Sequence, residues 1–166
     1  MKKLILLLAI IGAAFYFYQQ KKQSALDPEV IANPTFAEIR MTLDARGRTF
    51  EQVFFAKTVD DADCKKYSKN VIDDLQKKQA NDSAGHWLVK SSECKPELTP
   101  RYAKLFDNEP TFVTYLSMAR SDRRERETRL LYWGVSVEES DKVCDGVSKM
   151  QNGRKGAVTC IRAVRQ

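Results

Sequence analysis

The sequence has one histidine, His86, and four cysteines among its 166 residues. One histidine excludes His-rich metal sites and the two-histidine HExxH site of zinc peptidases. The four cysteines form no CxxC pair, which argues against structural zinc and against a thioredoxin-like redox centre. The sequence also lacks a P-loop and a GxGxxG motif. We therefore expect no metal and no cofactor.

A catalytic role for His86 would require a nearby nucleophile and an orienting acid. Ser83, Ser91 and Ser92 are close in sequence, but none lies in a nucleophile-elbow motif. Two of the three carboxylate pairs fall at predicted helix starts, where acidic side chains stabilise the helix. We therefore predict a protein that is not an enzyme and has no catalytic residues, and an envelope hydrolase is the second alternative.

The one long apolar run extends from Leu4 to Tyr18 and follows two lysines. A basic start followed by an apolar stretch is typical of a secretion signal. As a helix the run would be about 22 Å long, and no small-x-small cleavage site occurs at an ordinary leader length. We predict that residues 1–23 form an uncleaved signal-anchor, a single transmembrane helix in a bacterial inner membrane, and that residues 24–35 are a linker. Cleavage, which would release a periplasmic or secreted protein, is the alternative.

Residues 36–166 are predicted to form one extracytoplasmic α+β domain with two similar ββαβ units, at 36–94 and 111–164. Each unit contains two strands, a helix and a strand, with Thr58 and Ser136 as the expected helix caps. A short helix beginning at Thr99-Pro100 and ending near Asp107 is expected between them. We predict a mostly antiparallel sheet with the two main helices on one face. The sequence leaves open whether the sheet is continuous or divided into two lobes.

The cysteines allow three pairings. In each half, one cysteine is on the predicted helix and the other is on, or just beyond, the next strand. Cys64 and Cys94 lie about 27 and 30 Å from the intervening turn, and Cys144 and Cys160 about 14 and 13–23 Å from theirs. These matched distances predict the disulfides Cys64–Cys94 and Cys144–Cys160. Stable disulfides indicate an oxidising compartment, so we place the domain in the periplasm and the N-terminus in the cytoplasm.

Basic residues cluster in the charged segment 120–129, which we interpret as a hairpin tip, and near the C-terminus. The guanidinium group of arginine can donate two parallel hydrogen bonds to a phosphate or a carboxylate. These residues are therefore candidates for binding an anion or an acidic partner. The alternative is a solvated tip whose charges pair with one another. The candidate residues are Arg120, Arg123, Arg124, Arg126, Arg129, Arg154, Lys155 and Arg162.

The net charge of +6 overstates the basicity of the domain. Four of the 28 positive residues flank the apolar run and all 22 acids lie beyond it, which leaves a net charge of +2. A nucleic-acid partner is therefore not favoured. Binding of an anionic ligand by the basic residues is the first alternative, and that ligand would be a lipid headgroup, an acidic glycan or a nucleic acid. Our leading interpretation is a membrane-tethered accessory protein that binds another envelope protein, with an exposed sheet edge available for strand addition.

Overall fold

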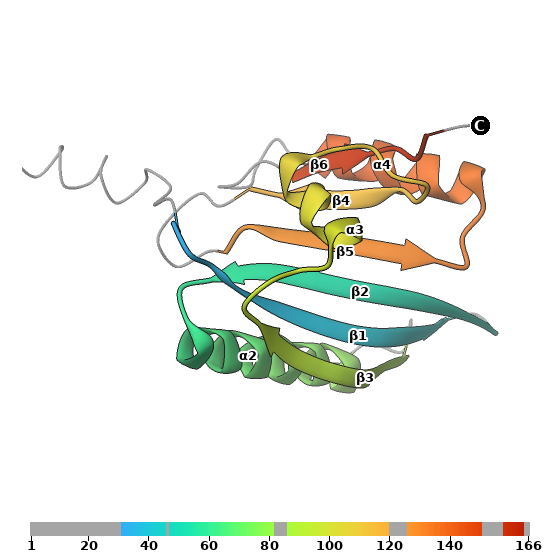
Figure 1. Ribbon diagram of the computed structural model, residues 1–166. Helices are drawn as coiled ribbons and strands as arrows, with labels where there is room; N and C mark the ends of the chain where they lie inside the picture. The colour runs from blue at the N-terminus through green and yellow to red at the C-terminus, as the bar shows by residue number, and fades with distance from the viewer. Residues whose placement is uncertain (1–30, 46, 82–85, 120–125, 151–157, 165–166) are drawn as a thin grey trace, which may run out of the picture.

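Six strands form one continuous antiparallel sheet in the order β3-β1-β2-β5-β4-β6 (Figure 1). The computed structural model describes residues 31–45, 47–81, 86–119, 126–150 and 158–164. Pairing of β2 with β5 joins the two halves, so the fold has one sheet and not two lobes. The strands are β1 (Thr35–Ala45), β2 (Arg48–Thr58), β3 (His86–Lys95), β4 (Tyr115–Met118), β5 (Thr128–Trp133) and β6 (Val158–Ile161).

The two halves are arranged in opposite order about the β2–β5 pair. The first half contributes β3-β1-β2 and the second contributes β5-β4-β6, so each half places its last strand at an outer edge. The first half has the longer strands, because β1 and β2 are eleven residues each and β4 has only four. Alternation of Ile39 and Met41 with polar neighbours places one face of β1 in the core, as the sequence predicts.

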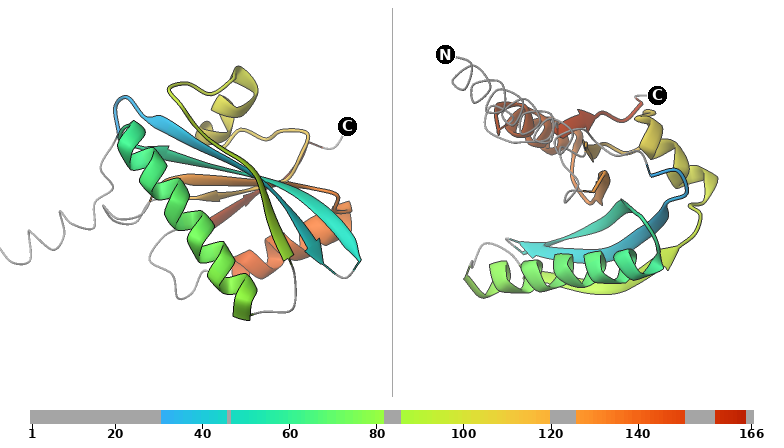
Figure 2. Two further views of the ribbon diagram at one scale, coloured as in Figure 1. Left: turned by 90° about the horizontal axis from the view of Figure 1, so that it is seen from below. Right: turned by 90° about the vertical axis from the view of Figure 1, so that its left-hand side faces the viewer.

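Two long helices cover one face of the sheet and a short helical segment covers the other (Figure 2). On β2, Phe54 stacks on Tyr67 of α2, whereas the adjacent Phe55 contacts Tyr102 of α3. Successive strand residues point to opposite faces, so α2 and α3 lie on opposite sides. The helices are α2 (Asp61–Asn81), α3 (Pro100–Ala103), the 3-10 helix η1 (Lys104–Asp107) and α4 (Val137–Met150).

Helix α4 lies on the same face as α2. Cys160 aligns in register with Leu116, Leu130 and Phe54 across four neighbouring strands, so these side chains share a face. Cys160 is bonded to Cys144 of α4, and Phe54 contacts α2. The prediction of an antiparallel α+β fold with both main helices on one face is confirmed, as is the short helix that begins at Pro100.

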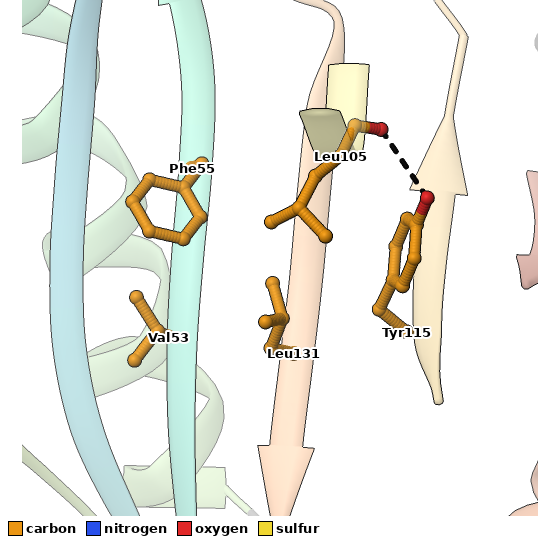
Figure 3. Packing of buried hydrophobic residues seen from close by; sticks show 5 residues of the cluster. All are labelled: Val53, Phe55, Leu105, Tyr115 and Leu131. Atoms are coloured by element: carbon orange, nitrogen blue, oxygen red, sulfur yellow. Dashed lines mark hydrogen bonds between the residues drawn. The ribbon is translucent and has the colours of Figure 1, made fainter. Parts of the chain in front are cut away.

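The main core lies between the sheet and the α3–η1 segment. Figure 3 shows its five buried side chains: Val53, Phe55, Leu105, Tyr115 and Leu131. The Tyr115 hydroxyl donates to the carbonyl oxygen of Glu109 at 2.9 Å, so this buried polar group is satisfied. Burial of a side chain such as Phe55 or Leu105 contributes about 1.5–3 kcal/mol. A smaller cluster of Ala37, Ala56 and Cys64 packs between the sheet and α2.

The predicted cap of the first helix is wrong by two residues. Thr58 is the last residue of β2, fully buried, and its hydroxyl donates to the Thr35 carbonyl at 2.6 Å. The cap is Asp60, whose carboxylate accepts the amide N–H of Asp63 at 2.8 Å. Ser136 caps α4 as predicted, through a reciprocal capping box with Glu139.

The predicted signal-anchor at residues 1–23 lies outside the described residues, and so does most of the linker. Strand β1 begins at Thr35, the last residue assigned to that linker. Within the described ranges, no helix is both long enough and apolar enough to cross a bilayer.

Candidate partner-binding surface

Three of the eight candidate basic residues lie in the part of the chain that the structure describes, and one of these is in the core. Arg129 is 1% exposed. Its Nε donates to the Leu105 carbonyl at 2.7 Å, and its terminal nitrogens donate to Phe106 and Thr128 carbonyls. Arg129 also pairs with Glu127 at 2.7 Å. The guanidinium therefore has its hydrogen-bonding partners within the domain, near the end of η1. The prediction that Arg129 binds an anion is wrong, because the side chain is buried.

The other two described arginines pair with acids. Arg126 forms a two-pronged ion pair with Asp63, at 2.7 and 3.0 Å, which joins the start of β5 to the start of α2. Desolvation raises the pKa of Asp63, but hydrogen bonds from Arg126 and from the Val59 amide outweigh that effect and leave the pKa lowered. Arg162 contacts Asp141 at 3.1 Å. The remaining candidates lie outside the described residues: Arg120, Arg123, Arg124, Arg154 and Lys155.

His86 lies at the beginning of β3 and its ring contacts the side chain of Gln79. The Gln79 carbonyl oxygen also accepts the Trp87 amide at 3.1 Å, so this glutamine joins the last turns of α2 to β3. In the described ranges, no cluster of histidine, cysteine and acidic side chains is arranged to hold a metal ion. The contact of His86 with Gln79 therefore links the start of β3 to the last turns of α2.

The acids at the start of α4 have a structural role. Glu139 accepts the Ser136 amide and pairs with Arg48 at 2.6 Å, and these interactions lower its pKa to about 2. Arg48 also donates to the Gly134 carbonyl at 2.7 Å, which ties the β1–β2 hairpin to the second half.

Glu38 is a buried carboxylate that the sequence reasoning missed. It is 3% exposed and lies 2.6 Å from both Arg40 and Lys95. Desolvation raises its pKa, but hydrogen bonds from Lys95 and Arg40 outweigh that effect and leave the pKa lowered. The polar alternation of Glu38 with Arg40 and Thr42 along β1 was the available signal.

Both predicted disulfides are present. Cys64 bonds to Cys94 with a Cα–Cα distance of 6.0 Å, and Cys144 bonds to Cys160 at 5.3 Å. Each joins a long helix to one of the two edge strands, on the same sheet face. The bonds therefore fix α2 against β3 and α4 against β6, and their presence is consistent with an oxidising, extracytoplasmic compartment.

The longer of the two edge strands is β3. It has ten residues and pairs on one side with β1, whereas β6 at the other edge has four residues. The pairing with β1 shifts register between Arg40 and Met41, so Lys90 is an extra residue in β3. From Ser91 to Lys95 the ladder is regular. Such an edge presents backbone donors and acceptors to an incoming strand.

A groove of about 400 Å³ runs beside this regular part of β3. Its walls come from α2 and from β3, and Cys94 of the disulfide is part of its lining. Lys65 and Lys69 are about three-quarters exposed on the helix wall, where they pair with Asp61 and Asp73. The lining residues are Asp61, Lys65, Ser68, Lys69, Ile72, Ser92 and Cys94.

Comparison with known proteins finds no matching family model, no matching curated protein and no matching solved structure.

Proposed function

We propose that this chain is a membrane-tethered, extracytoplasmic interaction domain that binds an extended segment of another envelope protein along β3. The observation that carries the proposal is the ten-residue edge strand held against α2 by the Cys64–Cys94 disulfide, with a groove of about 400 Å³ between them. A bound segment would extend the sheet by one strand, and its alternate side chains would enter the groove.

The disulfide supports this function through preorganisation. A groove whose two walls are covalently joined loses little conformational entropy when a segment binds. The regular ladder from Ser91 to Lys95 adjoins the groove, because Ser92 and Cys94 belong to both. The free backbone groups of the β3 edge and the groove for side chains are therefore next to each other, so one extended segment can use both.

The charges favour a segment that carries acidic residues. Lys65 and Lys69 lie on the helix wall, and Lys95 ends the strand. Each already has an acidic neighbour within the domain, so a partner carboxylate would share these lysines and not neutralise bare charges. Such exposed pairs contribute little affinity, about 0–1 kcal/mol each, and mainly select the partner.

Site-specific photo-crosslinking in intact cells tests the proposal. The crosslinker replaces exposed Ser92 in the groove of the full-length protein, or exposed Thr159 on β6 as the matched control. We expect a discrete adduct from Ser92 and not from Thr159, with all crosslinks mapping to one contiguous segment of one envelope protein. A second change, Ile72→Asp in the groove, should remove the adduct.

Equal adducts at Ser92 and Thr159, or crosslinks scattered over many proteins, would show that the β3 edge has no specific partner. Monomer alone from Ser92 would contradict the proposal equally.

The alternative of anion binding through the arginine-rich segment has weaker support. The described arginines Arg126, Arg129 and Arg162 all have acidic partners within the domain. Arg129 pairs with Glu127 within the segment, whereas Arg126 and Arg162 pair with acids of the two long helices, Asp63 and Asp141.

A further inference from the structure

A second hollow, of about 380 Å³, lies on the sheet face opposite α2. Two rows of residues in register form its base. One row is Thr42, Glu51 and Trp133, and the next includes Arg40 and Val53. Its volume falls within the range of about 300–1,000 Å³ that is usual for small-ligand sites. The hollow is thus a separate site on the opposite face from the β3–α2 groove.

Aromatic side chains line this hollow, which lies next to α3 on the sheet. Tyr102 of α3 packs on Phe55, with ring centroids 4.8 Å apart, and also lines the hollow. Trp133 of β5 lies beside Glu51 and packs at the margin of the main core. Val53, which lines the hollow, is seen in Figure 3 on β2, beside Leu131 on the adjacent strand β5. Two partly exposed rings, those of Tyr102 and Trp133, therefore line a hollow whose base combines the apolar Val53 with polar side chains.

The polar groups around the rings include both donors and acceptors. Arg40 and Lys90 donate, Glu51 accepts, and the Thr42 hydroxyl can do both. The Nε of Arg40 donates to Glu38 at 2.7 Å, which holds this cation in position. Desolvation lowers the Arg40 pKa, but hydrogen bonds to Tyr102 and Glu38 outweigh it and keep the pKa raised.

We infer that this hollow binds a saccharide chain. A sugar ring has an apolar C–H face that packs on aromatic rings and a rim of hydroxyls that both donate and accept hydrogen bonds, which matches the lining. A polyanion fits less well, because Glu51 lies in the middle of one row, between Thr42 and Trp133. The inference is independent of the proposed protein-binding function.

Trp133 provides the readout. The chain has two tryptophans, so Trp87→Phe leaves Trp133 as the single tryptophan of the full-length protein in detergent, and excitation at its absorption edge avoids the tyrosines. This protein is titrated with N-acetylchitotetraose, a neutral chain, and with tetragalacturonate, an acidic chain. We expect a saturable change in Trp133 fluorescence with the neutral N-acetylchitotetraose and weaker binding of the acidic tetragalacturonate, because the Glu51 carboxylate repels other carboxylates.

Glu51→Gln, made in the same background, should weaken that binding about tenfold, whereas the exposed Glu97→Gln outside the hollow should leave it unchanged. Inorganic polyphosphate should compete poorly. The inference is overturned if neither saccharide changes Trp133 fluorescence, if Glu51→Gln and Glu97→Gln behave alike, or if polyphosphate binds as tightly as the saccharides.

Discussion

Arg129 shows how a single cation stabilises the connection between the halves of this fold. Its guanidinium satisfies carbonyls of Leu105 and Phe106 near the end of η1, where no further helical N–H groups are available. The side chain also lies over the Phe106 ring, 4.7 Å from its centroid. Arg129 thus anchors the η1 segment to β5, which brings the α3–η1 segment onto the sheet.

Arg129→Lys should destabilise the domain by about 2–4 kcal/mol, because one ammonium cannot satisfy acceptors in several directions and the unpaired carbonyls stay buried. Arg101→Lys, at an exposed arginine over Phe112, is the matched control and should cost about 0.5 kcal/mol or less. Urea unfolding of the two variants measures the difference. Equal unfolding midpoints would contradict the role assigned to Arg129.

Glu38 should make the stability depend on pH in the acidic range. Its pKa is lowered from 4.5 in the folded protein, so the unfolded chain takes up the proton first as the pH falls. The stabilisation by Glu38 is therefore complete above about pH 5 and is lost progressively below it. Glu38→Gln should be destabilising at pH 7, with a difference from the wild type that shrinks toward pH 3. A difference that stays constant from pH 7 to pH 3 would show that Glu38 does not titrate in this way.

The sequence was least informative about the burial and the partners of single side chains. Arg126 and Arg129 are three residues apart in one basic segment, yet one forms a partly buried ion pair with Asp63 of α2 and the other is fully buried. Composition and spacing cannot separate them, because their difference depends on which distant residues the fold brings near. Glu38 was missed for the same reason, since Lys95 joins it only when β3 pairs with β1.

At the scale of helices and strands, local patterns were sufficient. The cap of α4, the short helix after Thr99 and the alternation in β1 were all predicted, because each depends on neighbours in the chain. The cap of α2 was misassigned because Thr58 and Asp60 both suit a helix start. Only the pairing of Thr58 with Thr35 decides between them.

The two long helices carry cysteine and serine in exchanged positions. Cys64 and Ser68 lie four and eight residues after the cap Asp60, whereas Ser140 and Cys144 lie four and eight residues after the cap Ser136. All four side chains are buried. Each disulfide therefore joins its helix to an edge strand at a different turn, and only Cys64–Cys94 lines the β3 groove.

The two disulfides should contribute similar amounts to stability and different amounts to binding. The sequence separations of 30 and 16 residues imply about 3–4 kcal/mol for each in the loop-entropy model. Replacing either pair by serines should lower the urea midpoint by a comparable amount. A midpoint unchanged by either replacement would show that the bond does not hold the helix to the sheet.

At the scale of the whole molecule, the sequence predicted the composition of the sheet but not its continuity. The order of strands, helices and disulfides follows from each half alone, whereas the join depends on eleven-residue β2 pairing with β5. Neither strand carries a local signal for the other, because both halves have apolar strands able to pair. The hollow that includes Trp133 also exists only after this pairing, because its lining comes from both halves.

At this scale, our central proposal is that a partner binds beside β3, where the Cys64–Cys94 disulfide holds α2 against the strand. The direct measurement is the yield of the Ser92 photo-adduct in two full-length double variants, C64S/C94S and C144S/C160S, normalised to the amount of each protein. We expect the adduct to be lost in the first variant and kept in the second, although both are destabilised to a similar extent. An adduct of equal yield in both variants would contradict the claim that the disulfide-held groove beside β3 is the binding site.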